Sequence, residues 1–292
     1  MHRFVEFSLN GLTTGMIYAS VAIGLVLIWR GTRILNFAQG GMAMVSTFVA
    51  ATILDRHASY WLAFVAALVA GLIMGAVVER VLIRPVESKP PINAVIVTLG
   101  LLILLESGAA MIWGGSFRAF PTPFGIAGFK VGSGRIALSP FDLFTILAVV
   151  GVMLGLLVLF RWTSMGLRMR AAAFEPEVAR LLGVRVGRMF TLGWALAAGV
   201  GALGGLLVAP NVLLYPNNMD TVLVFGFTAA ILGGLDSPIG AIVGGLVIGF
   251  ALSYIAGYLG AELESMGALV ILVAVLMVRP EGVFSRTAPR RV

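Results

Sequence analysis

The sequence predicts an all-α polytopic membrane protein. Hydrophobic residues make up 60% of the 292-residue chain, charged residues make up 11%, and the mean hydropathy is +1.04. A single soluble domain cannot bury this much apolar surface in one core. The run 7–29 contains no charged residue, and an α-helix of that length crosses the hydrocarbon of a bilayer. Because the run is long and its one small-residue site lies at its middle, we interpret it as a spanning helix and not as a signal peptide.

Apolar segments continue along the rest of the chain and predict a bundle of about eight to ten transmembrane helices. Two of them, 35–54 and 221–235, are short or rich in glycine, which favours broken or re-entrant helices buried among the others. Glycines four residues apart recur within the segments and predict close packing between helix backbones. The nine segments are 7–29, 35–54, 60–83, 92–113, 141–160, 189–208, 221–235, 239–256 and 263–278.

The distribution of basic residues predicts how the helices are oriented. With the C-terminus inside, fifteen of the twenty Lys and Arg residues fall on the cytoplasmic side. Lys and Arg accumulate on that side of a membrane, so we expect the bacterial inner membrane, with the N-terminus outside and the C-terminus inside. The segment 114–140 is then the longest outer connection, and it is either a contact surface for an external partner or a solvated connector. The five outer basic residues are Arg3, Arg56, Arg118, Lys130 and Arg135.

Several function classes are disfavoured by residues that the sequence lacks. It has no cysteine, and its two histidines, His2 and His57, lie at a terminus and in a predicted loop, so we expect no metal site. The net charge of +7 follows from membrane topology and does not indicate nucleic acid. No phosphate-binding loop and no hydrolase motif occurs. We therefore expect that the chain is not an enzyme and does not hydrolyse ATP by itself.

A polar loop, 161–188, interrupts the apolar sequence. Pro176 stands at a first helical position, Glu175 and Glu177 lie beside the positive helix start, and Gly183 stands where the helix ends. These features predict a short helix with both ends specified. About two turns of helix are marginal in water, so we expect it to be held by docking onto a partner, by the flanking spans, or by both. Its apolar side consists of Val178, Leu181 and Leu182.

This loop resembles the EAA-type coupling segment of the permeases of ABC importers, in which a short cytosolic helix followed by a glycine inserts into the ATP-binding subunit. Four further blocks resemble the branched-chain amino-acid permeases of the high-affinity Liv type, specifically their H-type subunits. The chain departs modestly from the family pattern at Gln39, where many relatives carry His, and at Glu175-Pro176, where Asp or Asn often precedes the proline. The four blocks are 10–19, 34–40, 231–241 and 279–284.

The resemblance implies a single permease domain, 1–292, of the ABC importer type, which moves branched-chain or other hydrophobic amino acids by alternating access. It implies a second, M-type permease, two cytosolic ATP-binding subunits and a periplasmic substrate-binding protein as partners, within membrane lipid. ATP and Mg would be used by the partner subunit, and this chain would bind no cofactor. Two alternatives stay open: an ABC permease that carries urea or a short amide, and, less favoured, an ion-coupled secondary transporter. The coupling residues implied are Glu175, Pro176, Glu177, Arg180, Leu181, Leu182 and Gly183.

Three polar residues within the predicted spans are candidates for the substrate pathway. Glu106 is singled out as the acidic residue deep in a span, where an ionisable group is either functional or a protonated or hydrogen-bonded structural residue. Asn36 and Gln39, one turn apart, either line the pathway or hold helices together by hydrogen bonds. No pair of opposite charges is expected inside the spans.

Overall fold

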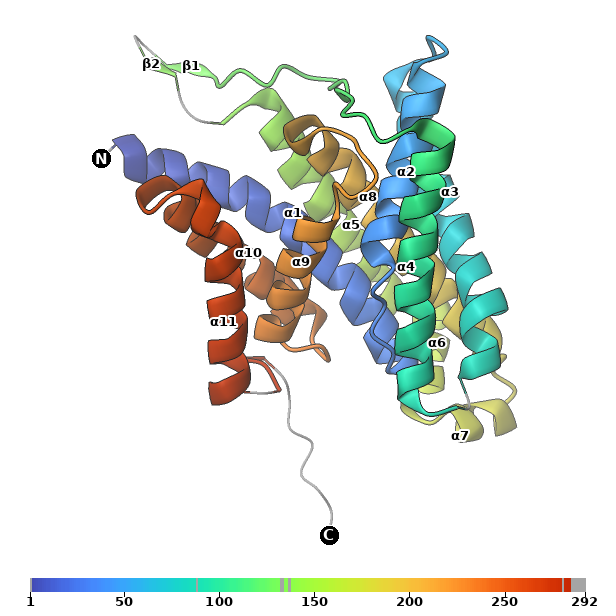
Figure 1. Ribbon diagram of the computed structural model, residues 1–292. Coiled ribbons are helices and arrows are strands. Elements are labelled where there is room, and N and C mark those ends of the chain that lie inside the picture. Colours follow the sequence, from blue (N-terminus) through green and yellow to red (C-terminus); the bar gives the residue numbers. More distant parts are fainter. Residues whose placement is uncertain (1, 88, 132–133, 136–137, 280, 285–292) are drawn as a thin grey trace.

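The computed structural model describes residues 2–87, 89–131, 134–135, 138–279 and 281–284. Within them the chain is almost entirely helical apart from one two-stranded hairpin (Figure 1). The elements are α1 (His2–Thr32), α2 (Gln39–Leu54), α3 (Tyr60–Val78), the π-helical turn η1 (Glu79–Ile83), the 3-10 turn η2 (Arg84–Val86), α4 (Pro91–Trp113), β1 (Lys130–Val131), β2 (Gly134–Arg135), α5 (Pro140–Trp162), α6 (Ser164–Phe174), α7 (Pro176–Leu181), α8 (Val186–Val212), α9 (Asp220–Gly233), α10 (Pro238–Tyr258), the 3-10 turn η3 (Ala261–Leu263) and α11 (Glu264–Val278).

Each of the nine apolar segments predicted from the sequence contains one helix, which confirms the all-α polytopic fold. Seven helices of the described chain are long and apolar enough to cross a membrane. The other two, α2 and α9, have 16 and 14 residues. At the rise of an α-helix, α9 is roughly 21 Å long, which is less than the thickness of the hydrocarbon. Both short helices are largely buried among the others, as their glycine content suggested.

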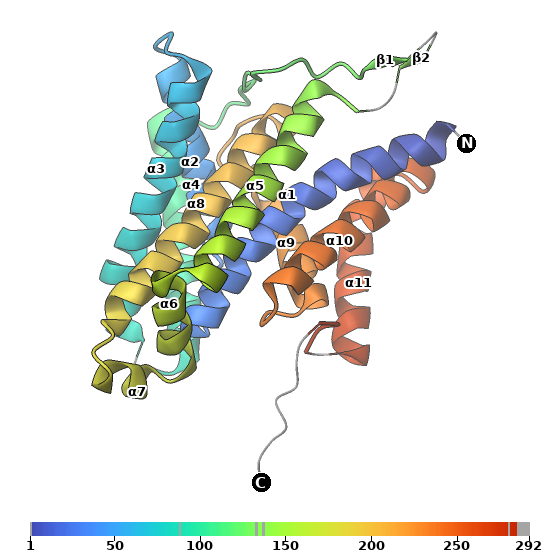
Figure 2. The same cartoon turned by 180° about the vertical axis from the view of Figure 1, so that it is seen from behind.

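Two helices form the centre of the bundle and three form much of its exposed surface. α1 runs diagonally through the molecule and packs against α8, α9 and α10 (Figures 1 and 2). Both α1 and α8 are mostly buried, whereas α4, α5 and α11 expose most of their apolar side chains. An apolar exterior of this extent suits a helix that meets lipid or another membrane subunit.

Glycines allow the closest helix contacts. A Cβ at Gly249 of α10 would overlap the backbone of Gly15 in α1, and a Cβ at Gly75 of α3 would overlap the Trp194 carbonyl in α8. The predicted role of the small residues is therefore confirmed at these contacts. At Gly151 and Gly155 of α5, no described part of this chain lies within 4 Å of an added Cβ, so the prediction stays untested there. The sequence pattern records which glycines share a helix face but not what that face meets.

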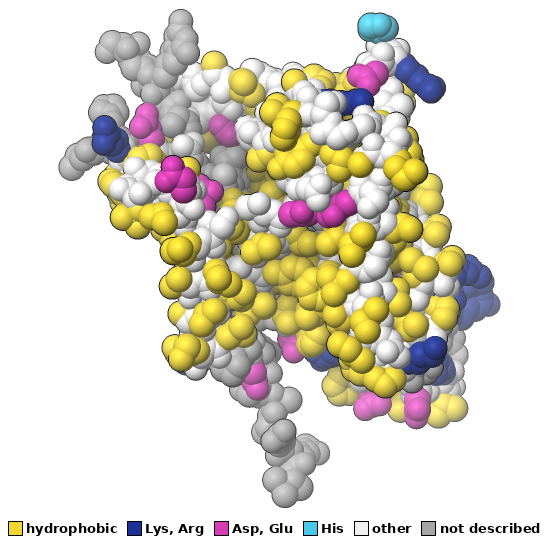
Figure 3. Space-filling model, viewed as in Figure 1, with side chains coloured by type: hydrophobic (Ala, Val, Ile, Leu, Met, Phe, Trp, Pro, Cys, Tyr) yellow, Lys and Arg dark blue, Asp and Glu magenta, His cyan; other side chains and the backbone are white. Residues whose placement is uncertain are grey.

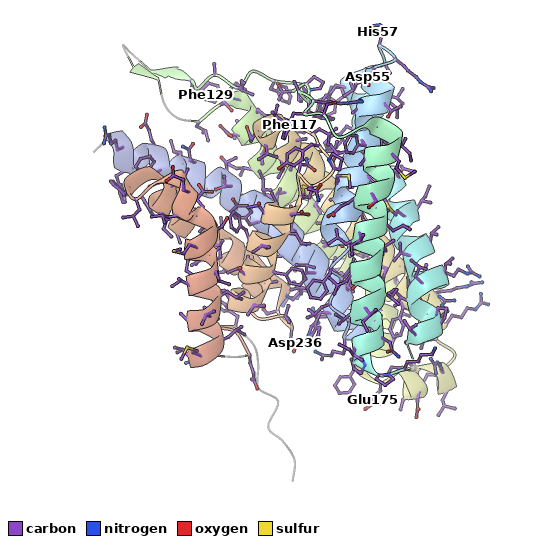
Figure 4. The ribbon with its side chains drawn as sticks, viewed as in Figure 1. Asp55, His57, Phe117, Phe129, Glu175 and Asp236 are labelled. Carbon is purple, nitrogen blue, oxygen red and sulfur yellow. The ribbon has the colours of Figure 1, made fainter. Side chains whose placement is uncertain are left out.

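The bundle has two distinct ends, which we call the α7 end and the hairpin end. Glu175 and Asp236 lie at the α7 end, whereas Asp55, His57, Phe117 and Phe129 lie at the hairpin end (Figure 4). α1 begins at the hairpin end and α11 finishes at the α7 end (Figure 1). Three of the basic residues that the sequence assigns to the cytoplasmic side, Arg286, Arg290 and Arg291, lie outside the described residues, as do parts of the segment 114–140.

At the α7 end, two of the sequence blocks meet. The segment that follows α11 returns to the end of α9, where the Val283 amide donates to the Leu232 carbonyl (2.9 Å). Gly282, with φ +86°, packs directly on the backbone of Gly234. The last carbonyls of a helix have no partner within it, and the segment after α11 supplies hydrogen-bond donors to those at the end of α9.

Candidate functional site

The polar loop 161–188 folds into two helices and not into the one that the sequence predicts. Thr163 caps α6, with its hydroxyl accepting a hydrogen bond from the Gly166 amide (3.0 Å). α7 then begins at Pro176, as expected, and Gly183 follows it with φ +81°. Thr163 is a preferred capping residue, but threonine is common and does not mark the start of a helix by itself, so the sequence does not predict α6.

α7 presents apolar side chains to the outside. The exposed fractions of Leu181 and Leu182 are 88% and 77%, and Phe174, at the end of α6, is 86% exposed. Val178 is half exposed, so of the residues in this helix only Ala179 is buried. Glu175, at the α7 end of the molecule, is also exposed (Figure 4). A small helix with its leucines outward matches a surface that another protein covers.

A separate hydrophobic cluster holds α6, α7 and the start of α8 together. Its buried members are Ala172, Ala179, Val186 and Phe190. The Val184 amide donates to the Ala179 carbonyl (2.9 Å), which closes the turn between α7 and α8. The two loop helices therefore share one small core with α8, distinct from the main core of the bundle.

An open cavity of about 2180 Å³ adjoins these helices at the α7 end. Its walls come from the end of α1, from α6, from the start of α8, and from the turn between α9 and α10. At its rim, Arg33 Nη1 lies 2.5 Å from Asp236 Oδ1, so an exposed ion pair joins the end of α1 to that turn. Figure 4 shows Asp236 at the lower edge of the bundle, between α11 and α4.

The structure gives Glu106 a hydrogen-bond partner, Asn217, that the sequence did not indicate. Asn217 Nδ2 donates to Glu106 Oε2 (3.1 Å) and lies 3.4 Å from Asp220 Oδ2. The cluster joins α4 to the loop before α9. Figure 3 shows one face of the molecule, on which carboxylates lie above a broad area of apolar side chains. Asn217 and Asp220 are exposed, so Glu106 is a polar residue on an exposed face and not one enclosed in the bundle.

Asn36 and Gln39 lie inside the bundle, where α1, α2 and α8 meet. Gln39 Nε2 donates to the Ala197 carbonyl (2.8 Å), and Asn36 Nδ2 donates to Gln39 Oε1 (3.1 Å). Each side chain is 1% exposed, and neither lines the cavity. The structure therefore brings Asn36 and Gln39 together but separates them from Glu106.

The acidic residue that is buried is Glu79, not Glu106. Glu79 lies in η1 at the end of α3, is 1% exposed, and pairs with Arg84 (2.9 Å). The expectation that the spans hold no charge pair is thus wrong at this position. Five residues separate the partners, which places them on different faces of an α-helix, and only the π-helical turn brings them together.

Beyond η2, Glu87 lies near the loop helices. Burial raises the pKa of the Glu87 carboxyl, and the charge of Glu79 adds to this effect, whereas the cations of Arg180 and Arg84 oppose it. Arg180 belongs to α7, so the end of α3 and the loop helix are electrostatic neighbours.

Comparison with known proteins identifies the family. Residues 7–278 match the model of a family described as branched-chain amino acid transport system / permease component. The chain belongs to this family. The resemblance drawn from four sequence blocks is therefore confirmed over nearly the whole chain.

Individual relatives of this permease agree. It is 30% identical to the high-affinity branched-chain amino acid transport system permease protein LivH of Escherichia coli, over 99% of this chain and 98% of the relative. It is 26% identical to the corresponding permease protein BraD of Pseudomonas aeruginosa, over 100% and 99%. A xylose/arabinose import permease protein, XylH of Sulfolobus acidocaldarius, is 28% identical over 65% of this chain and 54% of the relative. The chain is thus a permease component of an ABC-type transport system, a multi-pass membrane protein that works with other components of that system.

Proposed function

We propose that this permease is the transmembrane subunit of an ATP-driven importer for branched-chain or other hydrophobic amino acids. The observation that carries the proposal is the outward-facing α7, with its exposed Leu181 and Leu182. Hydrolysis takes place in a separate ATP-binding subunit that uses ATP and Mg, and this chain contributes no catalytic group.

α7 is the surface on which an ATP-binding subunit docks. Exposed leucines on a short helix are unfavourable in water, and a partner that buries them gains the corresponding hydrophobic free energy. Glu175, Glu177 and Arg180 surround the leucines with charges that set the orientation of docking. Pro176 and Gly183 fix the two ends of the helix, so that it is presented as one rigid element.

The α7 end faces the cytoplasm. The loops at this end carry most of the basic residues, which accumulate on the inner side of a bacterial membrane. The hairpin end then faces outward, with the N-terminus, and its exposed Phe117 and Phe129 offer an apolar surface for a substrate-binding protein (Figure 4). The extensively exposed α4 and α11 suit contact with a second permease subunit and with lipid.

Alternating access follows from the position of the cavity. Because α6 forms one wall and the turn between α9 and α10 forms another, a displacement of the loop helices changes the width of the cavity. Closure of the ATP-binding subunits moves α7 and so opens or closes the inner side of the pathway. Glu106, with Asn217, stands near the outer part of that pathway, and Asn36 with Gln39 stabilises the helices beside it.

The choice of cargo is supported by the names of the full-length relatives and by the broad area of apolar side chains on the face shown in Figure 3. A branched aliphatic side chain passes such a surface with few strong contacts. Urea or a short amide is compatible with the same surface, and the sugar permease among the relatives shows that cargo differs between related permeases.

The proposal is tested by reconstituting the chain in proteoliposomes with its second permease, both ATP-binding subunits and the binding protein. We expect uptake of labelled leucine that requires ATP and is inhibited by valine and isoleucine, but not by urea or arabinose. Uptake by this chain alone, driven by an ion gradient, would instead identify a secondary transporter. Uptake of urea with no uptake of leucine would show that the chain belongs to an ATP-driven importer whose substrate is urea and not an amino acid.

A further inference from the structure

A partly buried cluster of hydrogen bonds joins the end of α3 to the start of α8. Arg84 Nη2 lies 2.9 Å from Glu79 Oε2 and 3.1 Å from Glu79 Oε1. Thr191 donates from its hydroxyl to Glu79 Oε2 (2.6 Å) and accepts from Arg84 Nη2 (2.8 Å). Arg84 also donates to the Gly187 carbonyl (2.8 Å). We call Glu79, Arg84 and Thr191 the polar joint.

Stability alone is a weak explanation for the polar joint. The Glu79 carboxylate is buried, whereas the Arg84 side chain is 37% exposed. Moving the carboxylate out of water costs several kcal/mol, and hydrophobic residues of similar volume often replace such a pair without loss of stability. The π-helical turn that brings Glu79 and Arg84 together is also an irregularity, and such turns occur frequently at functional sites. The arrangement fixes the relative position of two helices, since the fork of an arginine binds a carboxylate in one geometry.

The helix held by the polar joint is the one that continues from α7. Gly187 lies in the first turn of α8, and Thr191 lies one turn later. Val186 and Phe190, in the same two turns, belong to the small core that contains Ala179 of α7. A displacement of α7 is therefore carried into this part of α8 through packed side chains.

The contacts of α3 with α8 further along are of another kind. Gly71 and Gly75 of α3 lie against Ala198 and Ala202 of α8. The Ser46 hydroxyl of α2 also lies beside Gly71, but it donates to the Met42 carbonyl of its own helix and does not join α3 to α8. Closely packed helices slide past each other by small amounts during shear motions. The hydrogen bonds at the α7 end fix the position of α3 along α8. The apolar contacts further along would by themselves allow α3 to slide.

We propose that the polar joint transmits the displacement of α7 to α3, so that α3 and α8 move as one unit during transport. Glu79, Arg84 and Thr191 act as positioning residues. This inference depends on the proposed function, because it assigns a path to the motion that the ATP-binding subunit supplies.

The test compares substrate moved per ATP hydrolysed in the complete reconstituted transporter. The double variant Glu79→Leu with Arg84→Met removes the polar joint and keeps an apolar core of similar size. We expect it to assemble and to unfold at a temperature close to that of the unaltered transporter, while uptake per ATP falls about fivefold or more. Arg80→Met is the matched control, because Arg80 lies in the same turn, is exposed, and makes no side-chain hydrogen bond with any described residue. The control should retain normal uptake per ATP.

A second pair of variants covers the case in which the double variant does not assemble. Thr191→Val keeps the shape of the side chain and removes the hydroxyl, whereas Thr191→Ser keeps the hydroxyl. We expect Thr191→Val to lower uptake per ATP and Thr191→Ser to preserve it. Equal uptake per ATP in both Thr191 variants, or in the assembled double variant and the unaltered transporter, would overturn the inference. Uptake by the unaltered transporter without ATP would contradict the proposed function itself.

Discussion

At the scale of single residues, Leu182 is the side chain whose exposure demands a partner. It is 77% exposed and follows directly on α7, so replacing it does not disturb the core. We expect Leu182→Glu to insert and fold normally and to lose ATP-dependent uptake by on the order of tenfold, as for a contact at the centre of an interface. Leu259→Glu, at a similarly exposed leucine after α10, is the control and should transport normally. Equal uptake in the two variants would mean that α7 is not a docking surface.

The hydrogen bonds of Gln39 contribute to the free energy of unfolding, which can be measured. Its amide satisfies the Ala197 carbonyl and accepts from Asn36, and all of these groups are buried. We expect Gln39→Leu to lower the free energy of unfolding by about 1–3 kcal/mol, because it leaves buried polar groups without partners. Unfolding in detergent by denaturant measures this change. Asn10→Leu, at an exposed amide of α1, should change the free energy little; a loss as large as that of Gln39→Leu would refute the hydrogen-bond explanation.

Glu106 accepts a hydrogen bond that the amide oxygen of a glutamine could accept equally well. Asn217 donates to Glu106 Oε2, and the side-chain oxygen of glutamine accepts the same hydrogen bond. We therefore expect Glu106→Gln to leave uptake within about twofold of normal, since neither shape nor hydrogen bond is lost. Loss of uptake in a normally assembled variant would instead assign the negative charge of Glu106 a direct role in the pathway.

Residue-level properties were the least accessible to sequence reasoning. The polar character of Asn36 and Gln39 was visible in the sequence, but their mutual hydrogen bond depends on how the chain turns between α1 and α2. The pairing of Glu79 with Arg84 cannot be predicted from the sequence, because residues five apart do not share a face of a regular helix. No local signal in the sequence predicted the π-helical turn.

At the scale of elements, the close contact of α1 with α10 is possible because glycines without side chains lie at it. A Cβ at Gly249 would overlap the backbone of Gly15, whereas a Cβ at Gly155 of α5 would meet nothing within 4 Å. We expect Gly249→Leu to destabilise the bundle by at least about 2 kcal/mol through overpacking, while Gly155→Leu is tolerated. Thermal unfolding of the purified chain compares the two variants, and equal stability would show that α1 and α10 are not in close contact.

The helices themselves were predictable because each requires a long apolar run. All nine apolar segments contain a helix, and Pro176 and Gly183 marked α7 correctly. α6 was missed, since its eleven residues are polar enough to read as a loop and its cap, Thr163, is a common residue. The open faces of Gly151 and Gly155 show the same limit, because spacing does not reveal which side of a helix meets a neighbour.

At the scale of the whole molecule, we propose that a partner docked on α7 supplies the movement of the bundle. α6 and α7 lie at one end of the molecule (Figure 1), and the small core and the cavity adjoin them. A partner docked there would have a short route to the pathway. The orientation of the chain in the membrane and the docking of an ATP-binding subunit on α7 are therefore the two parts of the proposal that an experiment has to test.

One measurement tests both. Since the chain has no cysteine, Leu181→Cys provides a unique reactive group on α7, and Leu259→Cys provides one at the other end. We expect a membrane-impermeant maleimide to label Leu181→Cys only from the cytoplasmic side and to be blocked when the ATP-binding subunits are bound. Leu259→Cys should react only from outside, whether or not they are bound. Labelling of Leu181→Cys from outside, or labelling that the ATP-binding subunits do not change, would contradict the account.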